Sequence, residues 1–202
     1  MISHKHKYIF VHIPKCAGSS MEKCLLEHEG IKVVFPTPFR AALSTLPQKV
    51  KEEYLLDTDS KQHNKLDTYD QDKQEQYFCF TFVRNPWSWA VSDYLYHKVR
   101  RDNVPTFDVW IQNLAKQSLY LYHMDPQVSY INNNINYIGR VEHIDTDWKH
   151  VTNSLFGCDI KLPKENKCWK QYDYKKFYCP ITRNVVANIY KDDIMRFGYT
   201  FE

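Results

Sequence analysis

The sequence predicts a three-layer α/β domain with a mostly parallel central sheet flanked by helices. Short apolar runs rich in β-branched and aromatic residues recur along the chain, as expected of strands that are covered on both faces. Each run is followed by a sharp turn and then by apolar residues at helical spacing. Because the 202 residues are 43% hydrophobic and poor in glycine, we expect one domain over residues 1–202.

The first strand–turn–helix unit begins with the buried strand at residues 8–13, Tyr-Ile-Phe-Val-His-Ile. A short loop follows, and a helical pattern begins near Ser19. Ser19 and Glu22 have the spacing of a capping box, which predicts that the Ser19 side chain caps this helix.

Three later segments continue the alternation. Residues 77–83 form a second buried strand, and Arg84-Asn85-Pro86 opens a helix, since proline suits a first helical position. A fainter strand at residues 135–138 precedes a helix at about 146–156, which ends at Gly157. The last helix is expected over about 182–197. The polar stretch at about 35–76 is expected to be an excursion over the site.

The loop after the first strand has the composition of an anion cradle. A strand that turns through a glycine into a helix presents unpaired backbone N–H groups and the positive end of the helix dipole. Lys15 adds a mobile positive charge there. The Walker A loop needs Gly-x-x-x-x-Gly-Lys-Ser/Thr, whereas this loop places its lysine directly after the strand. The difference argues against an ordinary ATPase or kinase.

Two motifs in order resemble a known family. Residues 13–20, Ile-Pro-Lys-Cys-Ala-Gly-Ser-Ser, resemble the 5'-phosphosulfate loop of the sulfotransferases. Residues 82–87, Phe-Val-Arg-Asn-Pro-Trp, with Ser92 eight residues after Arg84, resemble their 3'-phosphate motif. The resemblance continues at residues 138–142 and 193–199 and is strongest to carbohydrate sulfotransferases of the heparan 2-O and chondroitin types and their small bacterial relatives.

This resemblance implies a P-loop-like enzyme that moves a sulfuryl group from 3'-phosphoadenosine 5'-phosphosulfate (PAPS) to an acceptor hydroxyl, on a carbohydrate or a glycosylated small molecule. Arginine supplies a bidentate fork for a terminal phosphate and serine a single hydrogen bond. The donor is expected to contact Lys15, Cys16, Ala17, Gly18, Ser19, Ser20, Arg84, Ser92 and Lys167. Lys164 and Asn166 lie in the same basic loop as Lys167, for which an ordinary solvated turn is the alternative.

Catalysis is expected to rest on Lys15 and His63. By analogy with phosphoryl transfer, Lys15 would neutralise charge that grows on the leaving phosphate. The acceptor needs a base with a pKa near neutral, which favours histidine, and relatives of the heparan 2-O type carry theirs about where His63 lies. The alternative bases are Glu52, Glu53 and Glu142. No acidic cluster suggests a metal site.

Composition limits the other function classes. A formal charge of +3, spread along the chain, does not indicate a nucleic-acid binder. The polar N-terminus precedes too short an apolar stretch for a signal peptide, and no apolar run could cross a bilayer. We therefore expect a cytoplasmic protein, or else a piece of a Golgi-lumenal one. The six cysteines are expected to be free thiols, with a Cys168–Cys179 disulfide as the alternative.

A structural role is one interpretation of several other conspicuous residues. His12 lies on a buried strand and is expected to be a core group or a group behind the site. The run at residues 120–123, Tyr-Leu-Tyr-His, is expected in the core, although rings also stack on sugars. Arg140 and Glu142 follow a strand and either pair structurally or brace the donor loops.

Two rival functions remain open at this point. A P-loop kinase or nucleotide hydrolase would bind ATP with magnesium. A non-catalytic nucleotide-binding module would be expected to have lost Lys15, which is present.

Overall fold

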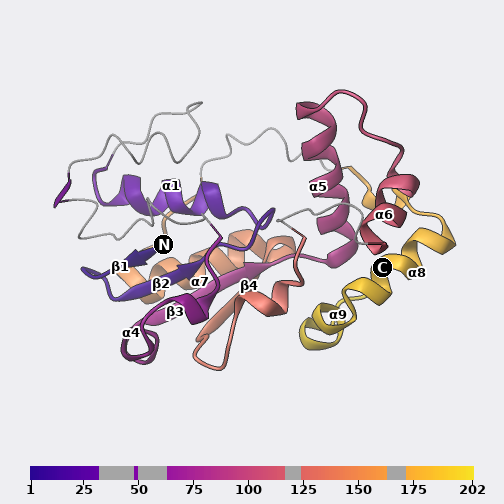
Figure 1. Cartoon of the computed structure of the whole chain (residues 1–202). Helices are drawn as coiled ribbons and strands as arrows, with labels where there is room; N and C mark the ends of the chain where they lie inside the picture. Colours follow the sequence, from indigo (N-terminus) through magenta and orange to yellow (C-terminus); the bar gives the residue numbers. More distant parts are fainter. Residues whose placement is uncertain (32–47, 50–62, 117–123, 163–171) are drawn as a thin grey trace. The chain divides into compact units, whose positions relative to one another are not determined.

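The computed structural model describes residues 1–31, 48–49, 63–116, 124–162 and 172–202. It contains one four-stranded sheet in the order β1-β2-β3-β4 (Figure 1), with β1 Ile2–Ser3, β2 Tyr8–Val11, β3 Phe78–Val83 and β4 Tyr137–Arg140. β1 pairs antiparallel with β2, and the other neighbours pair in parallel. The predicted α/β fold with a mostly parallel sheet is confirmed.

The strand register brings the carboxyl ends of the parallel strands to one edge. Val11 lies opposite Thr81, and Val83 lies opposite Arg140. The loop after β2 therefore leaves the sheet at the edge where open α/β sheets bind their ligands.

The chain divides into two compact units. The first comprises Met1–Val83 and Tyr130–Lys167 and contains the sheet. Its helices are α1 Gly18–His28, η1 Leu66–Thr68, α4 Gln71–Gln76, η3 Val141–His143 and α7 Ile144–Phe156. As predicted, α7 ends at Gly157, whose φ of 69° is left-handed.

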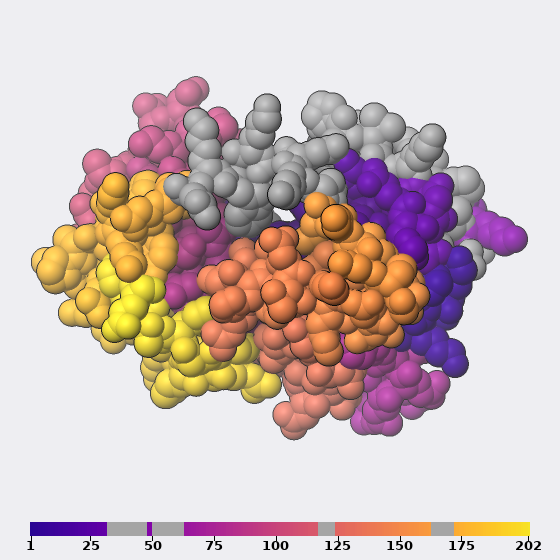
Figure 2. Space-filling model, turned by 180° about the vertical axis from the view of Figure 1, so that it is seen from behind, coloured from indigo at the N-terminus to yellow at the C-terminus, as the bar shows by residue number. Residues whose placement is uncertain are grey.

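Aromatic rings cover one face of this sheet. Tyr8 and Phe80 pack with ring centroids 6.0 Å apart, and Phe82 lies 6.3 Å from Trp148 of α7. Since alternate residues of a strand share a face, α7 covers the face that carries these rings. At the C-terminal end of α7, Phe156 packs on His28 at the end of α1, and Figure 2 shows the orange α7 segment beside the violet N-terminal segment.

The second unit comprises Arg84–Ser129 and Cys168–Glu202 and is helical. Its elements are α5 Pro86–Arg100, α6 Phe107–Ala115, η5 Tyr174–Phe177, α8 Pro180–Ile189 and α9 Lys191–Phe197, with η2 Gln127–Tyr130 at its boundary. α5 begins as predicted, with proline in its first turn.

The single helix predicted over 182–197 is wrong, because α8 and α9 are separated at Tyr190. The backbone of Tyr190 has φ −109° and ψ 30°, outside the helical range. Its ring is fully buried against Trp89, and its hydroxyl donates to the carbonyl of Met124 at 3.1 Å. The burial of this ring and hydroxyl accompanies the break, and hydrophobic periodicity alone does not reveal it.

Candidate functional site

The loop between β2 and α1 is held in a strained backbone conformation. Lys15 has φ 62° and Ala17 has φ 65°, although neither is a glycine. Left-handed φ costs an L-residue roughly 1–2 kcal/mol, and such strain clusters at functional sites. We call residues 14–20 the donor loop, after the contact with the donor that the sequence resemblance predicts for it. Its alternation of left-handed residues resembles the N–H nests that hold anions.

The donor loop contains further backbone hydrogen bonds. Cys16 N–H donates to the carbonyl of Ile13 at 3.4 Å, and Ser20 N–H donates to that of Ala17 at 3.0 Å. Gly18 and Ser19 occupy the first turn of α1, where N–H groups have no partner within the helix. With the positive end of the α1 dipole, these N–H groups form an anion cradle.

The predicted capping box at Ser19 is wrong. The residue at the N-cap of α1 is Ala17, and it provides no side-chain cap. The helix starts two residues earlier than the pattern indicated, so Ser19 lies inside the first turn. Glu22 is then turned inward and buried, instead of reaching back to the helix start.

The side chains of the donor loop differ in exposure. Cys16 and Ala17 are buried, whereas Lys15, Ser19 and Ser20 are half-buried. The Cys16 thiol therefore points into the protein, and the loop presents backbone together with Lys15 and the two hydroxyls. The six predicted contacts of this loop lie on one continuous turn.

Two histidines and a glutamate lie behind the donor loop. His12 follows β2, and its Nδ1 lies 3.1 Å from Oε1 of Glu22. His63 Nδ1 lies 2.9 Å from the carbonyl oxygen of His12, and the two rings meet edge to face at 4.6 Å. The structure thus brings the predicted base into contact with the residue at the end of the strand that leads into the loop.

Gly18 is tightly packed against this cluster. A Cβ at residue 18 would lie 2.1 Å from Cδ2 of His12, well inside van der Waals contact. Position 18 therefore requires glycine because the His12 ring lies so close to its Cα, and not because the backbone has a left-handed φ. The sequence suggested that His12 is a core or supporting group, and the structure places its ring against the donor loop.

The second predicted motif starts where β3 ends. Arg84 is buried, and its Nε donates to Oγ of Ser88 at 2.9 Å. Asn85 caps α5 by accepting hydrogen bonds from the N–H groups of Trp87 and Ser88. Ser92, half-buried, lies one turn beyond Ser88 on the same helix face. Ser88 was not among the predicted site residues, although its spacing of four residues from Arg84 is a usable signal.

A buried glutamine holds the backbone of Arg84. Gln127 Oε1 accepts a hydrogen bond from Arg84 N–H, and Gln127 Nε2 donates to Arg84 O, both at 2.8 Å. Asp193 in turn accepts from the N–H groups of Gln127 at 2.9 Å and Val128 at 2.8 Å. Burial raises the pKa of the Asp193 carboxyl to about 6, although these hydrogen bonds oppose the shift. No local pattern pointed to Gln127, because its partner is 43 residues away.

The other residues singled out in the sequence lie partly at β4 and η3 and partly outside the described residues. Arg140 N–H donates to Asp147 at 2.7 Å, and Glu142 is exposed in η3. The described cysteines, Cys179 among them, are free thiols. Outside the described residues lie Lys167 and its neighbours Lys164 and Asn166, the alternative bases Glu52 and Glu53, the run 120–123, most of the 35–76 excursion, and Cys168.

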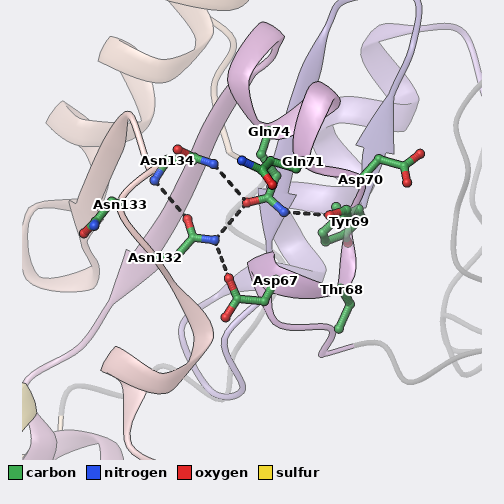
Figure 3. Close-up of a pocket in the computed structure, with 9 residues that line it drawn as sticks. All are labelled: Asp67, Thr68, Tyr69, Asp70, Gln71, Gln74, Asn132, Asn133 and Asn134. Atoms are coloured by element: carbon green, nitrogen blue, oxygen red, sulfur yellow. Dashed lines mark hydrogen bonds between the residues drawn. The ribbon is translucent and has the colours of Figure 1, made fainter.

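A polar hollow of about 640 Å³ lies elsewhere in the first unit (Figure 3). Asn132 Nδ2 donates to Asp67 and, at 2.8 Å, to Oε1 of Gln74, which also accepts from Asn134. These residues precede β3 and β4, whereas the donor loop follows β2. Because the three strands are parallel, the hollow lies at the opposite edge of the sheet from the loop. It is lined by Asp67, Thr68, Tyr69, Asp70, Gln71, Gln74, Asn132, Asn133 and Asn134.

The described residues contain neither a metal-binding cluster nor a membrane-spanning helix. No group of three or more histidine, cysteine, aspartate or glutamate side chains there could hold a metal ion. No helix among them is long and apolar enough to cross a membrane.

Comparison with known proteins identifies relatives of the chain. A profile described as "Sulfotransferase family" matches residues 1–200. A search of curated proteins with the sequence finds no match. Among solved structures, mouse sulfotransferase SULT7A1 complexed with PAP is similar, with a TM-score of 0.52 and 12% sequence identity. The alignment covers 96% of this chain and 85% of the mouse protein, and at this identity it shows the fold.

Proposed function

Because the chain belongs to the sulfotransferase family, we propose that it transfers a sulfuryl group from PAPS to a hydroxyl of a carbohydrate or a glycosylated small molecule. The observation that carries the proposal is the family match over residues 1–200, which includes a loop built as an anion cradle with Lys15 in it. The similar mouse protein is a complex with PAP, the product that PAPS leaves after transfer, and this supports the choice of donor.

The proposal assigns the two ends of the donor to two motifs. The donor loop, with its N–H groups and Lys15, would bind the 5'-phosphosulfate. Arg84 and Ser92 would bind the 3'-phosphate, which distinguishes this donor from ATP. Lys167 is proposed to contact the nucleotide. On this proposal, residues 1–202 act as one sulfotransferase domain.

The proposed reaction is an in-line displacement at sulfur. The bond between the acceptor oxygen and sulfur forms while the bond between sulfur and the bridging oxygen of the 5'-phosphate breaks. Charge then grows on the leaving phosphate, where Lys15 and the N–H groups of Gly18 and Ser19 would stabilise it. The acceptor proton passes to a base, and we propose no metal in this step.

His63 is the proposed base, and its contact with His12 supports this role. A carbonyl oxygen can only accept, so the hydrogen between His63 Nδ1 and His12 O belongs to the imidazole. The other ring nitrogen, Nε2, then carries the lone pair that takes the acceptor proton. His63→Ala is expected to lower turnover at least about 100-fold while leaving PAP affinity within about twofold. Turnover close to that of the wild type would give the role to another residue.

Binding of adenosine 3',5'-bisphosphate (PAP), measured by calorimetry without metal, tests the donor. The wild type should bind PAP in strong preference to ADP. Arg84→Ala should weaken PAP binding about 10- to 100-fold, because charge-assisted hydrogen bonds contribute roughly 1.5–3 kcal/mol each. The matched control is Arg100→Ala, at the far end of α5, which should bind PAP as the wild type does.

The alternatives predict different results in the same assay. A kinase or nucleotide hydrolase would bind ATP with magnesium, and a non-catalytic module would bind nucleotide without turnover. Absence of PAP binding by the wild type, or equal affinity in Arg84→Ala, would contradict the proposal. Incubation with PAPS labelled in the sulfuryl group and a panel of mono- and oligosaccharides would identify the acceptor class.

A further inference from the structure

The pair formed by His12 and Glu22 is unusual for its position. Both side chains are about 95% buried, and the contact between them is 3.1 Å. The other buried side chains of α1 are Met21, Cys24, Leu25 and Leu26. An apolar pair of similar volume is often as stable as a buried ion pair or more so, because two polar groups lose their hydration. Fold stability alone therefore does not explain why these two residues are here.

The imidazole of His12 lies against three residues, Glu22, Gly18 and His63. Glu22 Oε1 faces its Nδ1, and the Cδ2–Nε2 edge faces Gly18 of the donor loop. The ring of His63 packs against it edge to face at 4.6 Å. His12 is thus a spacer between the loop and the proposed base.

Residue 12 holds His63 in a second way, through its backbone. The His12 carbonyl accepts the Nδ1 hydrogen of His63 at 2.9 Å and so selects the tautomer with a basic Nε2. The side chain and the carbonyl of His12 leave the same Cα, so a carboxylate that fixes the ring also limits movement of the carbonyl. Glu22 provides the carboxyl group in contact with the ring, with its Oε1 3.1 Å from Nδ1.

We propose that Glu22 and His12 are positioning residues for sulfuryl transfer: the Glu22 carboxylate orients the His12 imidazole, and His12 holds His63 beside the donor loop at Gly18. This inference rests on the proposed function and deepens it. It predicts that loss of the pair impairs transfer without impairing donor binding, because neither side chain belongs to the loop itself.

Glu22→Gln tests the role with little change in shape. We expect PAP affinity within about twofold of the wild type and turnover of sulfuryl-labelled PAPS reduced at least tenfold, with the donor KM unchanged. The matched control is Glu29→Gln, which removes another buried glutamate in contact with a histidine, His6, from the opposite end of α1. This control should retain wild-type turnover.

Histidine side-chain ¹H–¹⁵N spectra of the full chain provide a readout that needs no acceptor. In the wild type, His63 should be in the Nδ1–H tautomer. In Glu22→Gln, the Nε2–H tautomer of His63 should appear, whereas Glu29→Gln should leave the His63 signals unchanged. Unchanged His63 signals in Glu22→Gln would overturn the proposal.

The double variant His12→Leu/Glu22→Met separates positioning from stability. Its apolar pair should keep the melting temperature near or above that of the wild type and preserve PAP binding, while turnover falls at least tenfold. Wild-type turnover in this variant, or equal losses in Glu22→Gln and Glu29→Gln, would leave the pair a purely structural role. If the wild type failed to bind PAP, the proposed function would fail instead, and the tautomer measurement would still decide the role of the pair.

Discussion

The donor loop and the segment around Arg84 are built in opposite ways. The loop relies on backbone: Lys15 and Ala17 have left-handed φ, and the N-cap of α1 has no side-chain hydrogen bond. The segment after β3 relies on side chains: Asn85 caps α5, and Gln127 holds the Arg84 backbone by two hydrogen bonds. PAP binding by the donor loop should therefore be sensitive to an added Cβ. PAP binding by Arg84 should instead be sensitive to loss of the side chains that hold the arginine.

Gly18→Ala should have the largest effect. The new Cβ would lie 2.1 Å from the His12 ring, so either the ring or the start of α1 must move. Overpacking of this kind costs about 1–3 kcal/mol, and the N–H groups of the cradle would shift with it. We expect PAP binding to be lost in calorimetry and the free energy of unfolding in urea to fall.

His12→Ala/Gly18→Ala is the control for this clash. Removing the imidazole makes room for the new methyl group, so the double variant should be more stable than the two single changes predict by addition. Strict additivity, or wild-type PAP affinity in Gly18→Ala, would contradict the tight packing at the loop.

Gln127→Leu should have the next largest effect. It leaves the buried N–H and carbonyl of Arg84 without the two bonds at 2.8 Å, at a cost of about 1–3 kcal/mol for each unsatisfied group. Because the 3'-phosphate is assigned to Arg84, the preference for PAP over ADP should shrink, which competition calorimetry would measure. An unchanged preference would mean that the two hydrogen bonds from Gln127 to the Arg84 backbone do not support binding of the donor.

Asp193→Asn should alter the pH dependence of stability. The pKa of Asp193 in the folded protein is about 6, above its ordinary value of 3.8, so the native state holds this proton more tightly than the unfolded state. The wild type should therefore lose about 2 kcal/mol of stability as pH rises from about 4 to 6. Asp193→Asn should flatten that slope in urea denaturation at several pH values. A slope that persists in the variant would assign it to other groups.

The smallest effects are expected at the two serines of α5. Ser92→Ala removes a proposed direct hydrogen bond to the 3'-phosphate and should weaken PAP binding about tenfold, since a single hydrogen bond to a charged group contributes about 1.5 kcal/mol at the lower end of its range. Ser88→Ala removes the acceptor for Arg84 Nε at 2.9 Å and should weaken binding less, because it acts only through the arginine. A larger loss in Ser88→Ala would reverse the order of the two roles.

Much of the fold could be predicted from sequence, because its signals are local. The apolar runs at 8–13 and 77–83, the proline that opens α5 and the glycine that ends α7 each act within a few residues. The break at Tyr190 could not be predicted in this way, because it accompanies the burial of one ring against Trp89 and of its hydroxyl near Met124. A continuous apolar pattern carries no information about such distant partners.

The sequence by itself determined the family, the α/β class and the order of the two motifs that we propose bind the donor, because each depends on residue types at fixed spacing. Only the tertiary structure decided the strained φ values of Lys15 and Ala17, the packing of His12 on Gly18, and the clamp on Arg84. It also turned Glu22 from a predicted partner in a helix cap into a buried partner of His12. These features join residues from different elements, and such contacts arise only when the chain has folded around them.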